Sequence, residues 1–442
     1  MKKILTLFVA LLFLKTGRAQ ENAFSLKQAI EFTLANQTQV KNALIEEELS
    51  KKKVNEIVGM GTPQIQASAE LNDFLDIPVS FVPGEFFGGE PGSFFPVKFG
   101  QQYSASAGVS VTQLLFDGSY LVGLQASKAF QELSHKQTKQ TRTEAAVNVT
   151  KAYYGALVSD ARLELIEANI IRINKLLSDT RALNQAGFVE KIDVDRLELT
   201  ANNLKVEKDK LLRFKAITYA LLKYQMNYPM DKEIVLSDKL DESVLTGVSL
   251  PDSVNYNARP EMEVLNVSRR LQELDLKRYK STYLPSLVAF GSFSYNNARS
   301  EFDIFDTGLK WFPTTLIGAK LTVPLWDGLQ KSARVSQAKL KLQQVDNSIE
   351  FAKNSFRLEL NNAKANFQNN NSSLAVVKKN RELAGEIARS AKIKYDNGVG
   401  SSLELTDAES SLREAEANYY STLYETIIAR IELDKASGVL TY

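Results

Sequence analysis

The stretch that decides the fold is residues 395–408, YDNGVGSSLELTDA, a glycine-containing turn between two long helical patterns. A second stretch matches it, because residues 184–197 read NQAGFVEKIDVDRL. In each stretch an acid follows a glycine by six residues, Asp193 after Gly187 and Glu404 after Gly398. The two glycines lie 211 residues apart, which indicates that the chain contains two copies of one structural plan.

A long helical pattern without an internal proline precedes each turn, over about residues 119–186 and 329–394. At 1.5 Å per residue, about 68 residues make a rod of roughly 100 Å. Both rods carry a seam of residues at alternating spacings of four and three, which is typical of coiled coils. Each residue of the second seam lies 211 after one of the first. The seams are Ala145, Val149, Ala152, Ala156, Ser159, Leu163, Ile166, Ile170, Ile173, Leu177, Thr180, Asn184 and Phe356, Leu360, Ala363, Phe367, Asn370, Leu374, Val377, Arg381, Ala384, Ala388, Ala391, Tyr395.

Strand patterns with a period of two precede each rod. They cover residues 64–71 and 103–112 in the first half, and residues 287–295 and 317–325 in the second. Helical patterns at residues 25–58 and 260–284 lead into the strands, and residues 76–101, rich in Pro, Gly and Phe, are predicted to form a long loop. The chain therefore divides into a first repeat at 20–226, an irregular segment at 227–252 and a second repeat at 253–442.

Residues 1–19 are predicted to be a secretory signal peptide, since Lys2 and Lys3 precede an apolar run that leads to a small-x-small step ending at Ala19. The run of about 11 residues is too short to cross ~30 Å of hydrocarbon. Its removal takes away four of the 54 Lys and Arg residues, against 52 Asp and Glu. This near balance gives no general argument for nucleic-acid binding.

The residue types argue against an enzyme. The chain has one histidine, His135, and no cysteine, which nearly excludes the usual His- or Cys-based triads, disulfides and thiolate metal sites. There is no phosphate-binding loop, dinucleotide fingerprint or G-x-S-x-G elbow. We predict neither catalysis nor a cofactor nor a metal, and an exported chain without cysteine suits a bacterial envelope.

Membrane insertion, if it occurs, must use the strands, because no apolar run of ~18 residues follows the signal peptide. A soluble sandwich would show the same alternation. However, the strands reach the ~9–11 residues that span a bilayer, and their polar face is small and largely uncharged. Four strands alone leave backbone edges that hydrocarbon does not tolerate. Other copies of the chain must complete the sheet.

Several motifs resemble the TolC-like outer-membrane efflux protein family: the order of elements, the corners at 116–118 and 326–328, the Leu-Pro-Ser step at 284–286 and the turn after Gly398. The resemblance covers nearly the whole mature chain. It implies an α+β fold, in which a trimeric twelve-stranded outer-membrane β-barrel, four strands per chain, continues into a long periplasmic α-helical coiled-coil tunnel. It also implies an outer-membrane channel of a tripartite efflux or type I secretion system, gated at its helical tips. The homotrimer would sit in outer-membrane lipid and dock through a periplasmic adaptor onto an inner-membrane transporter.

By the match around Gly398, the resemblance implies an acidic ring formed by Glu404 and Asp407. Their i, i+3 spacing puts both carboxylates on one helix face, so three chains would gather six carboxylates around one axis and attract cations. A simpler interpretation stays open, in which both acids favour the positive N-terminal end of the last helix.

The resemblance also implies contacts between tips. Tyr395 and Asp193 match a tyrosine and an aspartate that can hydrogen-bond between the two tips in the family. Gly400 stands where the family's best-known member has an arginine, and Arg196 on the first tip is the candidate substitute.

Gly187, Gly398 and Gly400 are the predicted turn glycines. We expect the acid pair of the second tip to face the pore, and the first tip, with Asp193 and Arg196, to make the contacts that hold it shut. A structural or adhesive coiled-coil stalk anchored by a barrel is the alternative function. It would share the rods and strands but has no need for an acid pair at a turn.

Overall fold

A computed structural model describes residues 23–248, 250–304, 306 and 308–440, so the predicted signal peptide lies outside the described residues. The chain forms two compact units, and each takes residues from both sequence repeats. Among the described residues, the first, here the helical unit, comprises those within 23–47, 133–266 and 347–440. The second, here the sheet unit, comprises residues 48–132 and 267–346.

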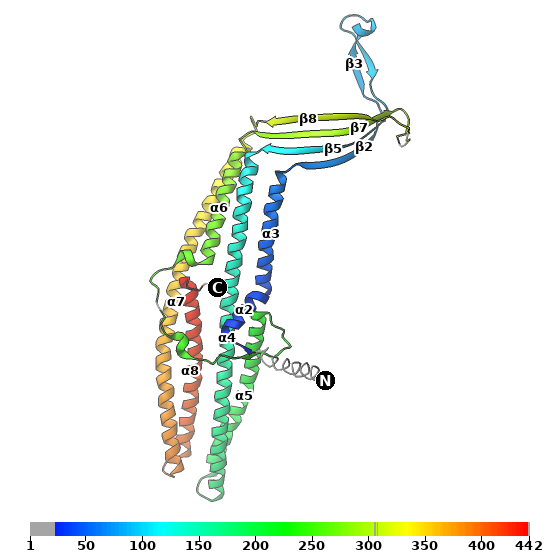
Figure 1. Ribbon diagram of the computed structural model, residues 1–442. Coiled ribbons are helices and arrows are strands. Elements are labelled where there is room, and N and C mark those ends of the chain that lie inside the picture. The colour runs from blue at the N-terminus through cyan, green and yellow to red at the C-terminus, as the bar shows by residue number, and fades with distance from the viewer. Residues whose placement is uncertain (1–22, 249, 305, 307, 441–442) are drawn as a thin grey trace, which may run out of the picture. The chain divides into compact units, whose positions relative to one another are not determined.

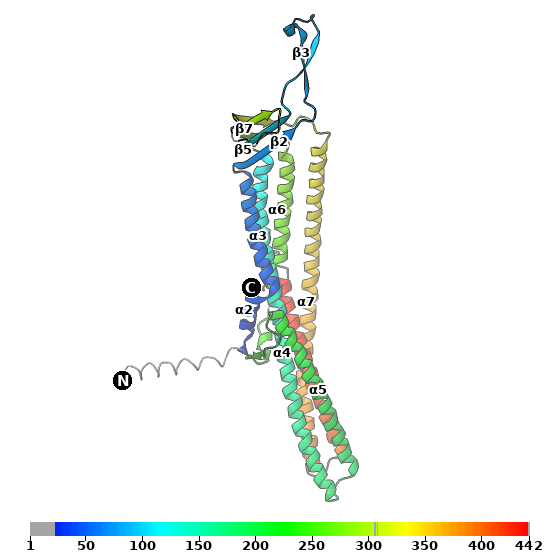
Figure 2. The same ribbon diagram turned by 90° about the vertical axis from the view of Figure 1, so that its right-hand side faces the viewer.

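Two antiparallel helical hairpins dominate the helical unit. The long helix α4 (Gly118–Gln185) pairs with α5 (Lys191–Met226), and the long helix α7 (Gln330–Asp396) pairs with α8 (Ser402–Ser437). Figures 1 and 2 show α4 beside α5 and α7 beside α8. Both long helices also contribute residues to the sheet unit. The predicted rods and turns are confirmed to within two residues.

The predicted seams form the interior of the helical unit. Ile173 and Leu177 of α4 lie in one buried cluster with Ala384 and Ala388 of α7 and with Leu405 of α8. A second buried cluster is built around Tyr153 and Leu423, both almost fully shielded from solvent. Because the same heptad positions are buried in both halves, the 211-residue offset reflects a real structural repeat.

Short elements surround the hairpins. They are β1 (Ala23–Phe24), α2 (Leu26–Asn36), β6 (Val235–Leu236) and the 3₁₀ helices η3 (Glu242–Leu245) and η4 (Tyr256–Ala258). Strands β1 and β6 pair in parallel. The irregular segment predicted at 227–252 contains β6 and η3 and is tied to both hairpins. The Tyr153 hydroxyl of α4 lies 3.0 Å from Asp238 Oδ2, and Lys378 Nζ of α7 lies 2.8 Å from Glu242 Oε2.

The helix predicted at 25–58 is two helices, α2 and α3 (Thr38–Met60). The chain breaks at Gln37, whose ψ of 133° is extended rather than helical. The predicted N-cap is confirmed, because Ser25 Oγ accepts a hydrogen bond from the Gln28 backbone amide and Gln28 Oε1 accepts one from the Ser25 backbone amide. This reciprocal capping box fixes the start of α2.

The sheet unit contains a four-stranded antiparallel sheet in the order β2-β5-β7-β8. Its strands are β2 (Gln64–Asp73), β5 (Tyr103–Phe116), β7 (Ser286–Arg299) and β8 (Phe312–Thr322). Helix α6 (Pro260–Ser281) leads into β7. The fourth strand was predicted at 317–325, whereas β8 lies at 312–322 and ends before Pro324, which has no amide to continue the ladder.

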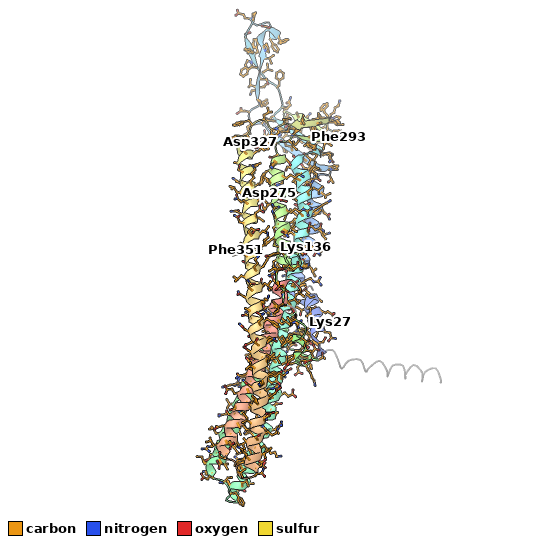
Figure 3. All side chains as sticks on the ribbon, turned by 90° about the vertical axis from the view of Figure 1, so that its left-hand side faces the viewer. Lys27, Lys136, Asp275, Phe293, Asp327 and Phe351 are labelled. Atoms are coloured by element: carbon orange, nitrogen blue, oxygen red, sulfur yellow. The ribbon has the colours of Figure 1, made fainter. Side chains whose placement is uncertain are left out.

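The register puts like side chains on the same face. Ala67 opposes Val109, which opposes Phe293 (labelled in Figure 3), and the residues next along the strands, Ser68, Gly108 and Ser294, form the matching row on the other face. Directly opposed residues share a face. The sheet therefore has one largely apolar and one largely polar face, as the alternation predicted.

The long loop predicted at 76–101 is wrong as a description of that segment. It contains a hairpin of β3 (Val79–Pro83) and β4 (Phe94–Lys98), joined through the 3₁₀ helix η2 (Gly84–Phe87). Proline and glycine suggested an irregular chain, but Pro83 and Pro96 stand on a two-stranded ribbon whose outer edges need no ladder amide.

Candidate functional site: the paired helical tips

The two turns that end the long helices share one backbone geometry. At the first tip, Gly187 donates to the Asn184 carbonyl and Phe188 to the Leu183 carbonyl, at 3.0 and 2.9 Å. At the second tip, Gly398 donates to the Tyr395 carbonyl and Val399 to the Lys394 carbonyl, both at 3.0 Å. Each of these residues lies 211 positions after its counterpart at the first tip. Gly187 and Gly398 have φ of +79° and +73°. This is a Schellman-type helix end, in which glycine adopts the left-handed region without strain.

Gly400 serves a different purpose, because its φ is not positive. A Cβ at this position would stand 2.8 Å from the Lys394 Cβ and 3.0 Å from the Tyr395 amide nitrogen. The chain thus leaves the second tip in close contact with the end of α7. The first tip has Val189 at the matching place, so the close approach belongs to the second tip.

The predicted acid pair lies at the start of α8. Glu404 and Asp407 are both exposed. Ser401 caps the helix by accepting a hydrogen bond from the Glu404 amide at 3.1 Å, and the Glu404 carboxylate pairs with Lys394 Nζ at 2.8 Å. Glu404 therefore does lie in the positive first turn of the helix, as the simpler interpretation held. Exposure of both acids on one helix face is also the arrangement that an acidic ring requires.

A groove of about 750 Å³ runs between α7 and α8 beside the tip, and both acids line it. The Lys394 side chain forms another part of its wall, together with Leu383, Ile387 and Leu403. These three apolar side chains are about half exposed. The second tip therefore presents carboxylates next to an apolar strip.

The first tip has an ion pair within one helix. Arg196 Nη1 lies 3.7 Å from Asp193 Oδ1, one turn away on α5. The Tyr395 hydroxyl is buried and makes its hydrogen bond within the chain, to Thr180 Oγ1 of α4 at 2.9 Å. The single chain thus brings Tyr395 to Thr180 and Asp193 to Arg196. The predicted contacts of these residues with a neighbouring tip stay predictions.

Sequence reasoning missed a polar layer that joins α4 to α8 deeper in the helical unit. Arg172 Nη2 lies 2.9 Å from Glu409 Oε2, and Asn169 donates to Glu416 at 3.1 Å. Glu409 is almost fully buried. Burial lowers the pKa of the nearby Arg413 guanidinium, an effect that the charge of Glu409 opposes. The signal was available, because Glu409 falls four residues after Leu405 and three before Leu412, at core spacing.

The described residues hold no group of three or more His, Asp or Glu side chains that could bind a metal ion. Among the described helices, none is both long enough and apolar enough to cross a membrane.

Comparison with known proteins identifies the class. The pattern of the outer membrane efflux protein family matches residues 92–210 and 257–439. Outer membrane protein TolC of Vibrio cholerae is 22% identical over 343 residues, which are 76% of this chain and 77% of that protein. Alkaline protease secretion protein AprF of Pseudomonas aeruginosa is 23% identical over 345 residues, 75% of this chain and 69% of that one. The crystal structure of CusC matches with a TM-score of 0.74 at 15% identity, covering 93% of this chain and 91% of CusC.

The paired long hairpins and the four-stranded sheet thus define a TolC-like outer-membrane channel fold. The family match covers more than half of the chain, and the chain belongs to the outer membrane efflux protein family. It is an outer-membrane protein that reaches into the periplasm, and its family consists of channel proteins for efflux or secretion.

Proposed function

We propose that the protein is the outer-membrane duct of a tripartite efflux or type I secretion system, working as a homotrimer. The observation that carries this proposal is a sheet that is open at both edges in a chain of this family. Strands β2 and β8 each pair on one side only among the described residues. Unpaired backbone groups cost several kcal/mol each in hydrocarbon, so β2 of one chain pairs with β8 of the next.

Three copies of a four-stranded sheet make a closed barrel of twelve strands. The apolar face, with Val109 and Phe293, turns toward lipid, and the polar face, with Ser68 and Ser294, turns toward the water-filled lumen. The helical hairpins follow the strands in sequence and continue the duct into the periplasm. The fold's division into two units suits this arrangement, since one unit meets the membrane and the other does not.

The tips form the gate of this duct. Glu404 and Asp407 of three chains form an acidic ring that favours cations. The first tips hold the ring narrow through Asp193 and Arg196, and Tyr395 at the end of α7 adds a further contact between tips. One observation supports this assignment: both acids are exposed on one face of α8.

The groove beside the second tip is where a periplasmic adaptor would dock. Its apolar residues Leu383, Ile387 and Leu403 suit a helical partner, and its acids suit basic side chains on that partner. An inner-membrane transporter would select the cargo. The chain itself would take no part in that selection, because its lumen offers small polar side chains rather than a specific pocket.

The proposal is tested on the purified full-length protein in two measurements. Mass photometry in detergent is expected to give the mass of three chains. Planar bilayers are expected to show an ion conductance that is small at rest and rises when Tyr395→Phe and Arg196→Ala loosen the tips. A trimer that conducts neither as the unmodified protein nor with the tip substitutions would favour the structural stalk. A monomer would contradict the proposed twelve-stranded barrel.

A further inference from the structure

The β3–β4 hairpin is the feature that the proposed duct leaves unexplained. It belongs to the connection from β2 to β5, at the end of the sheet away from the helices, since α3 precedes β2 and α4 follows β5. The matching connection in the second half, residues 300–311, has no such hairpin among its described residues. The hairpin is therefore an addition to the repeated plan.

The hairpin has a defined structure at its tip. Gly84 donates to the Ser93 carbonyl at 2.7 Å, and Gly89 donates to the Gly84 carbonyl at 2.8 Å. A Cβ on Gly84 would stand 2.1 Å from Ser93 Oγ and 3.1 Å from the Ser93 carbonyl oxygen, so a larger residue here would require Ser93 to move. The ring of Phe87 reaches back to Phe95, with centroids 6.0 Å apart. These contacts partly cover one face of the ribbon.

The other face, here the open face, is uncovered and is apolar apart from Lys98 at its base. Opposed pairs place Val79 with Lys98, Phe81 with Pro96, and Pro83 with Phe94 on this face. Phe81 is 71% exposed and Phe94 is 64% exposed. A two-stranded ribbon is marginally stable in water by itself, and a contiguous exposed apolar face marks an interaction site.

We infer that the open faces of the three hairpins of one trimer pack against each other above the barrel. This inference rests on the proposed function, because it requires the trimer. It assigns to the hairpin an apolar plug at the outer mouth of the duct, built from Phe81 and Phe94 of each chain. Such a plug narrows the exit on the side opposite to the tip gate.

The reach of the hairpin permits this packing. Its two legs, residues 74–78 and 99–102, span at most about 14–17 Å when extended. A barrel of twelve strands, spaced by about 4.8 Å and tilted by about 40°, has a radius of about 12 Å. Each hairpin can therefore reach the threefold axis, and tethering to one rim gives the three hairpins a high effective concentration.

Two further observations favour other copies of the chain over different occupants. Pro83 and Pro96 lack amide hydrogens, so neither strand can be fully extended by a foreign strand and association must use the face. Residues 74–102 carry Asp76, Glu85 and Glu90 against one basic residue, Lys98. This acidic balance disfavours an anionic lipid surface.

The absence of native cysteine allows a direct test in the full-length protein. Phe81→Cys and Lys98→Cys introduce single thiols on the open face, and Lys98→Cys leaves every phenylalanine in place. Ser80→Cys is the matched control, since Ser80 is exposed and adjacent but belongs to the other face. Outer membranes that contain each variant are treated with a short bis-maleimide and run on denaturing gels. We expect several-fold more cross-linked dimer from Phe81→Cys and Lys98→Cys than from Ser80→Cys.

Failure of the inference differs from failure of the trimer. If each variant has the mass of three chains but both open-face variants give no more dimer than Ser80→Cys, the hairpins stand apart and the inference is wrong. Protection of the open-face thiols from a mono-maleimide without cross-linking would mean that lipid or another protein covers the face, and it would overturn the inference equally. Absence of a trimer would remove both the plug and the proposed duct.

Discussion

The first and second tips share a backbone but differ in chemistry. Both end a long helix with the same pair of hydrogen bonds around Gly187 and Gly398. The side chains at matching positions then diverge, because the first tip pairs Asp193 with Arg196 along one helix, whereas the second pairs Glu404 with Lys394 across the turn. The duplicated plan therefore fixes the backbone geometry, and the chemical difference between the tips lies in the few side chains around it.

The two seams differ in a complementary way. Ile173 and Leu177 of α4 correspond to Ala384 and Ala388 of α7 at the offset of 211, and all four lie in one buried cluster. The shared cluster thus combines large side chains from one helix with small ones from its counterpart. The two copies thus depend on each other, although their patterns are equal.

Truncation of the first seam has the largest expected effect on stability. Ile173→Ala removes a side chain that is 1% exposed and lies in a buried cluster with Leu177 and Leu405. We expect a loss of about 2–5 kcal/mol in the free energy of unfolding, measured by circular dichroism during denaturant titration. Ile171→Ala is the control, since Ile171 is 71% exposed, and a similar loss in both variants would contradict the seam as the core.

The buried ion pair of Arg172 with Glu409 and the exposed ion pair of Lys394 with Glu404 are expected to differ in their contribution to stability. Glu409→Gln leaves Arg172 without its charged partner in a largely buried place, which costs about 1–3 kcal/mol after allowance for the partial exposure of Arg172. Glu404→Gln breaks an exposed pair and is expected to cost less than about 1 kcal/mol. Equal losses of unfolding free energy in the two variants would mean that burial does not make the Glu409 pair more important than the Glu404 pair.

The turn glycines test the shared backbone. Gly187→Ala and Gly398→Ala are each expected to cost about 1–2 kcal/mol, because alanine is strained in the left-handed region.

Gly400→Ala is expected to cost a similar amount through its close contact with the end of α7. Its counterpart Val189→Ala is expected to cost only about 0.5 kcal/mol. If Gly400→Ala is as mild as Val189→Ala, the close approach at the second tip is not needed for folding.

Glu242 connects η3 to α7 and α8 through Lys378 and Tyr419. The smallest expected effect is the pH dependence of stability that this carboxylate contributes. Hydrogen bonds from Lys378 and Tyr419 hold the pKa of Glu242 below its usual value. A carboxyl whose folded pKa is lowered stabilises the fold above its unfolded pKa of about 4.3, and this contribution is lost as the pH falls through the folded value. Glu242→Gln is therefore expected to lower the melting temperature near neutral pH and to flatten its fall in acid. If the melting temperature of Glu242→Gln falls in acid as steeply as that of the unmodified protein, other acidic residues control the acid dependence.

The fold was largely predictable because it depends on periodicity. The rods, the turns and the sheet faces all follow from heptad or alternating spacing, which side-chain burial enforces directly. The hairpin at 79–98 was missed because its phenylalanines are exposed on a ribbon with no core, so no alternation marks them. The break at Gln37 was missed because neither proline nor glycine signals it.

The location of the two tip acids on their helix was predictable from the sequence, but the side-chain contacts between separate helices were not. The sequence located Glu404 and Asp407 on one exposed face, and the structure has them there. The contact of Tyr395 with Thr180 and the buried pair of Arg172 with Glu409 join residues more than 200 positions apart. Side-chain pairing across that distance depends on the packing of separate helices, which spacing along the chain does not specify.

The central claim is that the second tip, not the first, forms the acidic mouth of the duct. The direct test is the reversal potential of the purified protein in planar bilayers under a potassium chloride gradient. Glu404→Ala with Asp407→Ala is expected to shift it strongly away from cation selectivity. Asp193→Ala, which removes an acid from the first tip, is expected to leave the reversal potential unchanged. An unshifted potential in the double variant, or an equal shift in Asp193→Ala, would contradict the claim.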